Sequence, residues 1–94
     1  MLSQFRFDVY LMTASGVSFD AGVTEWNADD AAVKRTALTA SRRTVLVADA
    51  GKFGAEAFVR VCPLSRVDLL VTDAGLAEAD RKQVAATGTE LVVA

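Results

Sequence analysis

TVLVADAGKFG, residues 44–54, is the stretch from which the rest of the sequence is interpreted. Its first half is apolar on both faces, as in a central strand of a parallel sheet, and turn residues follow it. Asp49 and Lys52 come directly after this strand. Because open α/β sheets bind ligands beyond the carboxyl ends of their strands, these two charged residues are candidates for a binding site.

The composition limits the class of protein. The 94 residues form one small domain at most, and 12 acidic against 10 basic residues give a net charge of −2. That balance argues against a free-standing nucleic-acid binder, which usually carries a basic face. One cysteine and no histidine exclude an internal disulfide and a zinc set, so we expect neither metal nor cofactor. The apolar runs are too short to span a bilayer and no signal-peptide pattern follows Met1, which predicts a cytoplasmic protein.

Strand and helix patterns alternate along the chain. The segment from Ser15 to Trp26 is interpreted as a long loop and residues 54–61 as irregular, with Pro63 and a turn after them. This alternation predicts an α/β fold, a Rossmann-like parallel sheet with flanking helices joined by right-handed crossovers. We expect strands at residues 7–12, 44–48, 67–72 and 89–93, and helices at residues 27–43 and 76–86.

The first helix has a clear start. Asn27 is a good N-cap, and Asp30 at the third helical position can return a hydrogen bond to the cap. Trp26 precedes the cap, where it can staple the helix to the sheet, line a pocket or lie at an interface. One face of this helix is expected to be apolar, through Ala31, Val33, Ala37, Leu38 and Ala40, and the other basic, through Lys34, Arg35, Arg42 and Arg43.

A short internal echo singles out the lysine. VADAG at residues 47–51 is repeated as VTDAG at residues 71–75, and each Asp is positioned to cap the turn that follows. The first copy continues with Lys52 and the second with Leu76. Since a structural strand end needs no lysine there, Lys52 is the more diagnostic of the two charged residues.

Several motifs in this order resemble the C-terminal sensor domain of the DeoR family of bacterial transcriptional regulators, over residues 7–94. By this resemblance, full members carry an N-terminal helix-turn-helix that binds DNA, followed by a sensor that binds a phosphorylated sugar or related metabolite. Residues 1–94 are then expected to form a partial sensor domain, without the helix-turn-helix and the first part of the sensor. The motifs are Ser15-Gly16, Gly22-Val23-Thr24, Asn27 with Ala31 to Lys34, Ala48-Asp49 with Lys52-Phe53-Gly54, and Pro63-Leu64-Ser65.

The resemblance and the strand-end argument together give six candidate effector-binding residues. Each also has a purely structural explanation, as a turn, cap or solvated charge, and Lys52 is the strongest because an ammonium can pair with a phosphate or carboxylate. The sequence departs from the family pattern at three places: Thr13 replaces Gly, Asp30 replaces Glu, and neither Ala50 nor Gly51 is Ser. The candidates are Lys52, Asp49, Asp30, Ser15, Gly16 and Thr24.

Two alternatives to effector sensing stay open. The family's sensor fold is similar to ribose-5-phosphate isomerase, but such an enzyme needs acidic residues at the end of the first strand, where residues 12–15 read MTAS. Without a base there, proton transfer on a sugar has no support, so we expect binding and no enzymatic activity. The third interpretation is a dimerisation module with an inactive pocket. In every case we expect a homo-oligomer and no direct contact with DNA or membrane.

Overall fold

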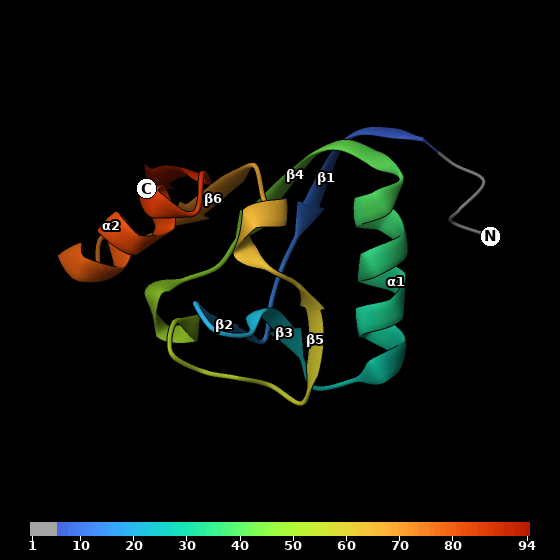
Figure 1. The fold of residues 1–94 in the computed structure, drawn as a ribbon, viewed down its shortest axis with the longest axis horizontal. Coiled ribbons are helices and arrows are strands. Elements are labelled where there is room, and N and C mark those ends of the chain that lie inside the picture. The colour runs from blue at the N-terminus through green and yellow to red at the C-terminus, as the bar shows by residue number, and fades with distance from the viewer. Residues whose placement is uncertain (1–5) are drawn as a thin grey trace.

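Two sheets and two helices make up the computed structural model, which describes residues 6–94 (Figure 1). Four strands form a parallel sheet in the order β1-β4-β6-β7, and three short strands form an antiparallel sheet in the order β2-β3-β5. The predicted α/β fold with a Rossmann-like parallel sheet is confirmed. The strands are β1 (Phe7–Met12), β2 (Gly16–Ser18), β3 (Gly22–Glu25), β4 (Ser41–Val47), β5 (Val59–Cys62), β6 (Leu69–Thr72) and β7 (Glu90–Val93); the helices are α1 (Ala28–Thr39) and α2 (Glu78–Ala86).

The core lies on one face of the parallel sheet. Met12, Leu46 and Leu70 are neighbours in the register of β1, β4 and β6, and all three are fully buried. Val17 and Val23, from the antiparallel sheet, complete this cluster from the other side. The two sheets therefore pack on each other and share one hydrophobic core.

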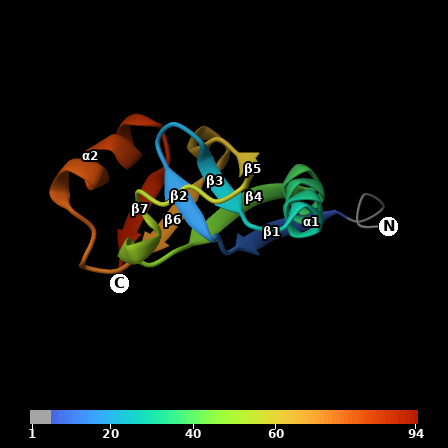
Figure 2. The same ribbon diagram turned by 90° about the horizontal axis from the view of Figure 1, so that it is seen from below.

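Within residues 6–94, no helix or second sheet covers the opposite face of the parallel sheet. Each connection advances to the next strand in the same direction, so right-handed crossovers all pass over the same face. Figure 2 shows α2 and the antiparallel sheet on one side of the four strands. Apolar side chains on the other side are exposed, namely Val9, Leu11, Val47 and Val92.

The predicted long loop between Ser15 and Trp26 is wrong, because this segment folds into the hairpin β2–β3. Gly16 pairs with Thr24, and Ser18 pairs with Gly22. Gly22 has φ +77°, a left-handed conformation that glycine adopts without steric cost and that lets the chain reverse within three residues. β2 and β3 are only three and four residues long, and the turn residues around them hide any alternating pattern.

The prediction of an irregular segment at residues 54–61 is also wrong, in the second half of that segment. Its last residues belong to β5, which pairs antiparallel with β3. Val61 faces the core and Arg60 faces solvent, which is the alternation of a half-buried strand. The pairing partner is more than 30 residues away in sequence, and that tertiary contact decides the conformation.

The first helix is shorter than predicted. It ends at Thr39, and Arg42 and Arg43 lie on β4 instead of at a helix end, because Ser41 already pairs with Phe7. Val33 is exposed, so it does not belong to the apolar face. The second helix begins at Glu78, two residues later than predicted. Within the described residues, neither helix is long and apolar enough to cross a membrane.

Candidate functional site

The carboxyl ends of β1, β4 and β6 lie at one edge of the parallel sheet, where the candidate site is built. The loop after β4 contains a short 3₁₀ turn, Ala50–Lys52, with Asp49 immediately before it. The backbone closes this turn through hydrogen bonds from Lys52 N to Asp49 O and from Phe53 N to Ala50 O. The turn holds Lys52 at the edge of the sheet, as the sequence predicts.

Asp73, from the second copy of the echo, braces this turn. Its Oδ2 accepts a hydrogen bond from Ala50 N at 3.2 Å, and its Oδ1 accepts one from Gly75 N at 2.9 Å. Asp49 makes no such side-chain bond, so the prediction that both aspartates cap their turns is wrong for Asp49. The loops after β4 and β6 are thus linked through one carboxylate.

The side chains of Asp49 and Lys52 are left without partners. Within residues 6–94, neither makes a hydrogen bond or an ion pair through its charged group. Asp49 is exposed, whereas Lys52 is half-buried. A partly buried ammonium without a counter-charge is electrostatically unsatisfied, so an anion bound beside it would gain a favourable interaction.

Two cavities lie on either side of this turn. A smaller one of about 200 Å³ touches Asp49 and Asp73 and is otherwise mostly apolar, with Val47, Val71 and Thr72 among its lining. A larger one of about 390 Å³ lies between the hairpin turn, the segment after Lys52 and α2. Its lining is aromatic and acidic, with Ser18, Phe19, Asp20, Phe53, Gly54, Glu56, Asp80 and Gln83.

Another cavity, of about 400 Å³, lies away from this edge. It is formed where β1 and β4 begin and α1 ends, between Phe7 and Arg42. Ligand sites of open α/β sheets are found at the carboxyl ends of strands, whereas this cavity lies at the amino ends of β1 and β4.

The structure brings Gly16 and Thr24 against the segment that follows Lys52. Thr24 Oγ1 donates to Gly16 O at 3.0 Å and accepts from Ala57 N at 2.9 Å. A Cβ at Gly16 would lie 2.3 Å from the carbonyl oxygen of Ala55, so only glycine permits this approach. Nearby, Gly54 N donates to Val17 O at 2.8 Å. These residues hold the segment after Lys52 on the hairpin.

Ser15 is bonded to Glu25, an acidic residue that the sequence analysis did not identify. Glu25 accepts hydrogen bonds from Ser15 N at 3.0 Å and Ser15 Oγ at 2.8 Å, and it pairs with Lys34 Nζ at 2.6 Å. Lys34 Nζ also donates to Thr13 O at 2.7 Å, directly after β1. The expectation that no carboxylate lies near residues 12–15 is therefore wrong. Glu25 lies ten positions further on, and only the hairpin brings it back.

The environment of Glu25 lowers the pKa of its carboxyl group despite its burial. Burial alone would raise the pKa of this carboxyl, but the hydrogen bonds from Lys34 and Ser15 and the charge of Lys34 outweigh it and lower the pKa. Burial, and then the charge of Glu25, raise the pKa of Tyr10. A carboxylate with three hydrogen bonds and a lowered pKa is a poor general base.

Asp30 lies apart from the other candidates. It is exposed in the first turn of α1, where Asn27 Oδ1 accepts hydrogen bonds from the backbone of Asp29 and Asp30. The predicted N-cap at Asn27 is confirmed, whereas the predicted return hydrogen bond to the Asp30 carboxylate is not formed within residues 6–94. In Figure 1 the antiparallel sheet lies between α1 and the turn at Ala50–Lys52, so the structure does not bring Asp30 to Lys52.

The parallel sheet, with a charged turn at the carboxyl ends of its strands, has the architecture in which open α/β domains place their ligand sites. The family model described as the DeoR C terminal sensor domain matches residues 1–74, which is most of the chain. The chain therefore belongs to the DeoR family of transcriptional regulators, and the resemblance in the sequence is confirmed.

Similar proteins in this family are transcriptional regulators. The HTH-type transcriptional regulator GlpR of Haloferax volcanii is 29% identical over 97% of this chain and 36% of its own length. The glycerol-3-phosphate regulon repressor of Escherichia coli is 37% identical over 78% of this chain and 29% of its own length. The deoxyribose operon repressor of Escherichia coli is 35% identical over 77% of this chain and 29% of its own length. The chain thus spans about a third of the length of these relatives.

Proposed function

We propose that this chain senses a phosphorylated sugar or related anionic metabolite for a cytoplasmic DeoR-type regulator. The single observation that carries the proposal is Lys52, a half-buried lysine at the carboxyl edge of a parallel sheet with no counter-charge within residues 6–94. The names of two relatives, which refer to glycerol-3-phosphate and to deoxyribose, agree with such a ligand class. In this proposal Lys52 pairs with the anionic group beside Asp49. The hairpin residues Ser15, Gly16 and Thr24 act indirectly, since Gly16 and Thr24 hold the segment after Lys52 and Ser15 is bonded to Glu25.

The regulatory mechanism follows from coupling between binding and assembly. DNA contact belongs to a helix-turn-helix that, with the first part of the sensor, lies outside these 94 residues; the coverage of the relatives supports this division. The effector favours one packing of a homo-oligomer over another and so changes the spacing of paired DNA-binding units. Asp30 lies in the first turn of α1, on the other side of the antiparallel sheet from Lys52, so we leave it out of this ligand site.

Catalysis is not part of this proposal. An isomerase would need a free carboxylate base near the end of β1, and Glu25 is held there by Ser15 and Lys34 with a lowered pKa. The expected result of a coupled assay with aldose and ketose phosphates is no turnover. Steady turnover that disappears in Glu25→Gln would replace the sensor proposal with an enzymatic one.

Thermal unfolding with a panel of sugar phosphates, including glycerol 3-phosphate and deoxyribose 5-phosphate, tests the role of Lys52. A ligand at 100 times its Kd stabilises the native state by about 2.7 kcal/mol, a Tm shift on the order of 10 °C for a domain of this size. Lys52→Ala should remove the shift, because the ammonium pairs with the phosphate. Lys82→Ala, which removes an exposed lysine on α2, should retain it. Equal shifts in the parent chain and Lys52→Ala would show that Lys52 does not hold the anion.

A further inference from the structure

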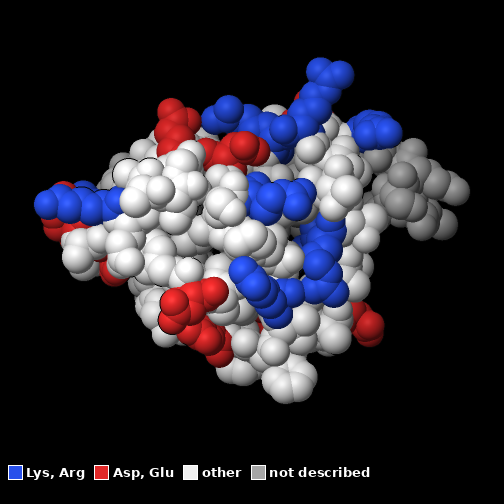
Figure 3. Space-filling view, in the orientation of Figure 1, with Lys and Arg blue, Asp and Glu red and all other residues white. Residues whose placement is uncertain are grey.

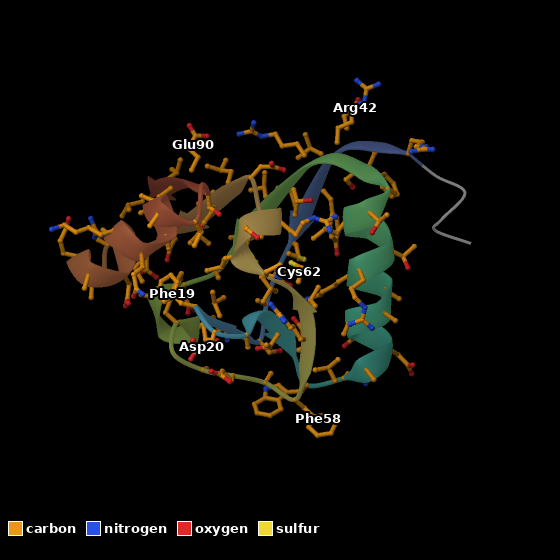
Figure 4. All side chains as sticks on the ribbon, viewed as in Figure 1. Phe19, Asp20, Arg42, Phe58, Cys62 and Glu90 are labelled. Atoms are coloured by element: carbon orange, nitrogen blue, oxygen red, sulfur yellow. The ribbon has the colours of Figure 1, made fainter. Side chains whose placement is uncertain are left out.

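Two large, exposed aromatic residues lie at one end of the antiparallel sheet. Trp26 is 67% exposed and Phe58 is 83% exposed. The register of β3 and β5 pairs Glu25 with Val59, so Trp26 and Phe58 follow as the next opposed pair beyond the ladder. Figure 4 shows the Phe58 ring at the lower edge of the molecule, pointing away from the ribbon. We name Trp26 and Phe58 the aromatic tip.

Exposure at this tip is not the general state of the aromatic residues in this chain. Tyr10, Phe19 and Phe53 all pack against the core. From their exposed fractions, the two tip residues present roughly 300 Å² of apolar surface, comparable to the largest patch on a typical monomer. Tryptophan and other large aromatics are the side chains that most often dominate binding energy when buried in an interface.

Opposite charges flank the aromatic tip. Along the chain, Glu56 precedes Phe58 by two residues and Arg60 follows it by two, and both are exposed. Arg35 strengthens the basic side, because its Nη1 donates to Arg60 O at 2.7 Å. Asp20 strengthens the acidic side, because it lines the same cavity as Glu56. Figure 3 shows acidic atoms to the lower left and basic atoms to their upper right, with uncharged surface beside them at the lower edge.

A surface with an apolar centre and opposite charges on its two sides is complementary to itself. A two-fold axis between the charged sides places the acidic side of one copy on the basic side of the other. The same bond from Arg35 to Arg60 O occupies a backbone acceptor of the edge strand β5. Contact through side chains is therefore favoured over addition of a further strand.

We propose that the aromatic tip is the centre of an interface with a second copy of this chain. Trp26 and Phe58 of both copies pack together across the two-fold axis, and Glu56 of each copy faces Arg60 of the other. This inference assigns an interface to the homo-oligomer of the proposed function. It depends on that homo-oligomer and not on the effector site. The modest apolar area places the complex among weak interfaces, with a Kd in the micromolar range.

Sedimentation of the full chain over a range of concentrations measures the dimer directly. We expect the mass to rise from 10.0 kDa toward twice that value as concentration increases. Trp26 is the single tryptophan, so its emission should shift to shorter wavelength over the same concentration range. Phe58→Ser should weaken dimerisation at least about tenfold, since it removes a central apolar contact. Leu11→Ser is the matched control on the bare sheet face, 68% exposed, and should leave the dimer unchanged.

A charge exchange separates this interface from any other. Arg60→Glu should weaken the dimer by placing like charges together, and the double variant Glu56→Lys/Arg60→Glu should restore it. A chain that stays monomeric at all concentrations, a double variant as weak as Arg60→Glu, or loss of the dimer in Leu11→Ser would each overturn the proposal. The Tm shift with sugar phosphates should persist in Phe58→Ser, so failure of the interface and failure of the effector site are distinguishable.

Discussion

The pair of Glu25 and Lys34 shows how a charge can be held inside a small domain. Glu25 is 10% exposed and Lys34 is 17% exposed at their side chains, and their charged atoms are 2.6 Å apart. Ser15 donates further hydrogen bonds to Glu25, and the backbone carbonyl of Thr13 accepts one from Lys34. Removing one partner of such a pair leaves the other buried and uncompensated, which costs more than the pair itself contributes.

Glu25→Gln should destabilise the chain by about 1–3 kcal/mol at neutral pH, because Lys34 loses its counter-charge. The folded-state pKa of Glu25 is lowered, so its contribution is complete above the unfolded pKa, about 4.3, and is lost as the pH falls through the folded value. Denaturant unfolding from pH 7 to pH 3 should therefore show a gap between parent and variant that closes in acid. Glu78→Gln, on the exposed start of α2, is the control and should change stability by less than about 0.5 kcal/mol.

Tyr10 reports on the same substitution. It is the single tyrosine, and the charge of Glu25 adds to burial in raising its pKa. Spectroscopic titration should show a lower pKa for Tyr10 in Glu25→Gln, still raised by burial. An unchanged Tyr10 together with a pH-independent stability gap would contradict the charge interaction described for Glu25.

Sequence reasoning found Lys52 and missed Glu25 for a physical reason. Lys52 follows a long apolar strand, so its place at the sheet edge depends on local pattern alone. Glu25 reaches Ser15 only through the hairpin β2–β3, and both strands are too short to be recognised from the sequence pattern. The one sequence signal for this strand was GVTE at residues 22–25, shortly before the helix cap. All four residues are buried in the structure.

Among the elements, β3 joins the candidate site to the rest of the fold. Thr24 on this strand holds both Gly16 in β2 and Ala57 before β5 through one hydroxyl group. Thr72 on β6 is equally buried, but its hydroxyl has no partner within residues 6–94. The two threonines thus provide a matched comparison of a satisfied and an unsatisfied buried hydroxyl.

Thr24→Val should cost about 1–3 kcal/mol, because it keeps the shape of the side chain and leaves Ala57 N and Gly16 O without their partner. Thr72→Val should be neutral or stabilising, because an unsatisfied hydroxyl is replaced by a methyl group. Denaturant unfolding of both variants measures the difference. Equal destabilisation of the two would show that the hydroxyl of Thr24 does not hold these segments together.

The strands of the parallel sheet were predictable, and those of the antiparallel sheet were not. Residues 44–48 and the N-cap at Asn27 carry enough local pattern to fix a strand and a helix start. β5 and the end of α1 depend on what lies across from them: Arg42 and Arg43 have ordinary helix propensity, yet pairing with β1 makes them part of a strand. Propensity is outweighed wherever a tertiary partner satisfies the backbone.

At the scale of the whole molecule, the strand order leaves one face of the parallel sheet uncovered. The sequence of residues 44–48 is apolar on both faces, which is typical of strands buried on both sides. Only one side is covered in the part of the chain that the structure describes, and no pattern in a single strand tells which face its connections cross. The direction in which successive strands are added decides this, and it is a property of the complete topology.

Leu11→Lys combined with Val47→Lys tests the bare face. Both side chains are exposed, so the double variant should change the free energy of unfolding by no more than about 1 kcal/mol. Leu46→Ala, on the covered face of the same sheet, should cost about 2–5 kcal/mol, since it opens a cavity in the core. The parent chain should bind a hydrophobic dye through the apolar face, and the double variant should bind much less of it. If the double variant loses as much stability as Leu46→Ala, the face is packed in solution and the arrangement of one covered and one bare face is wrong.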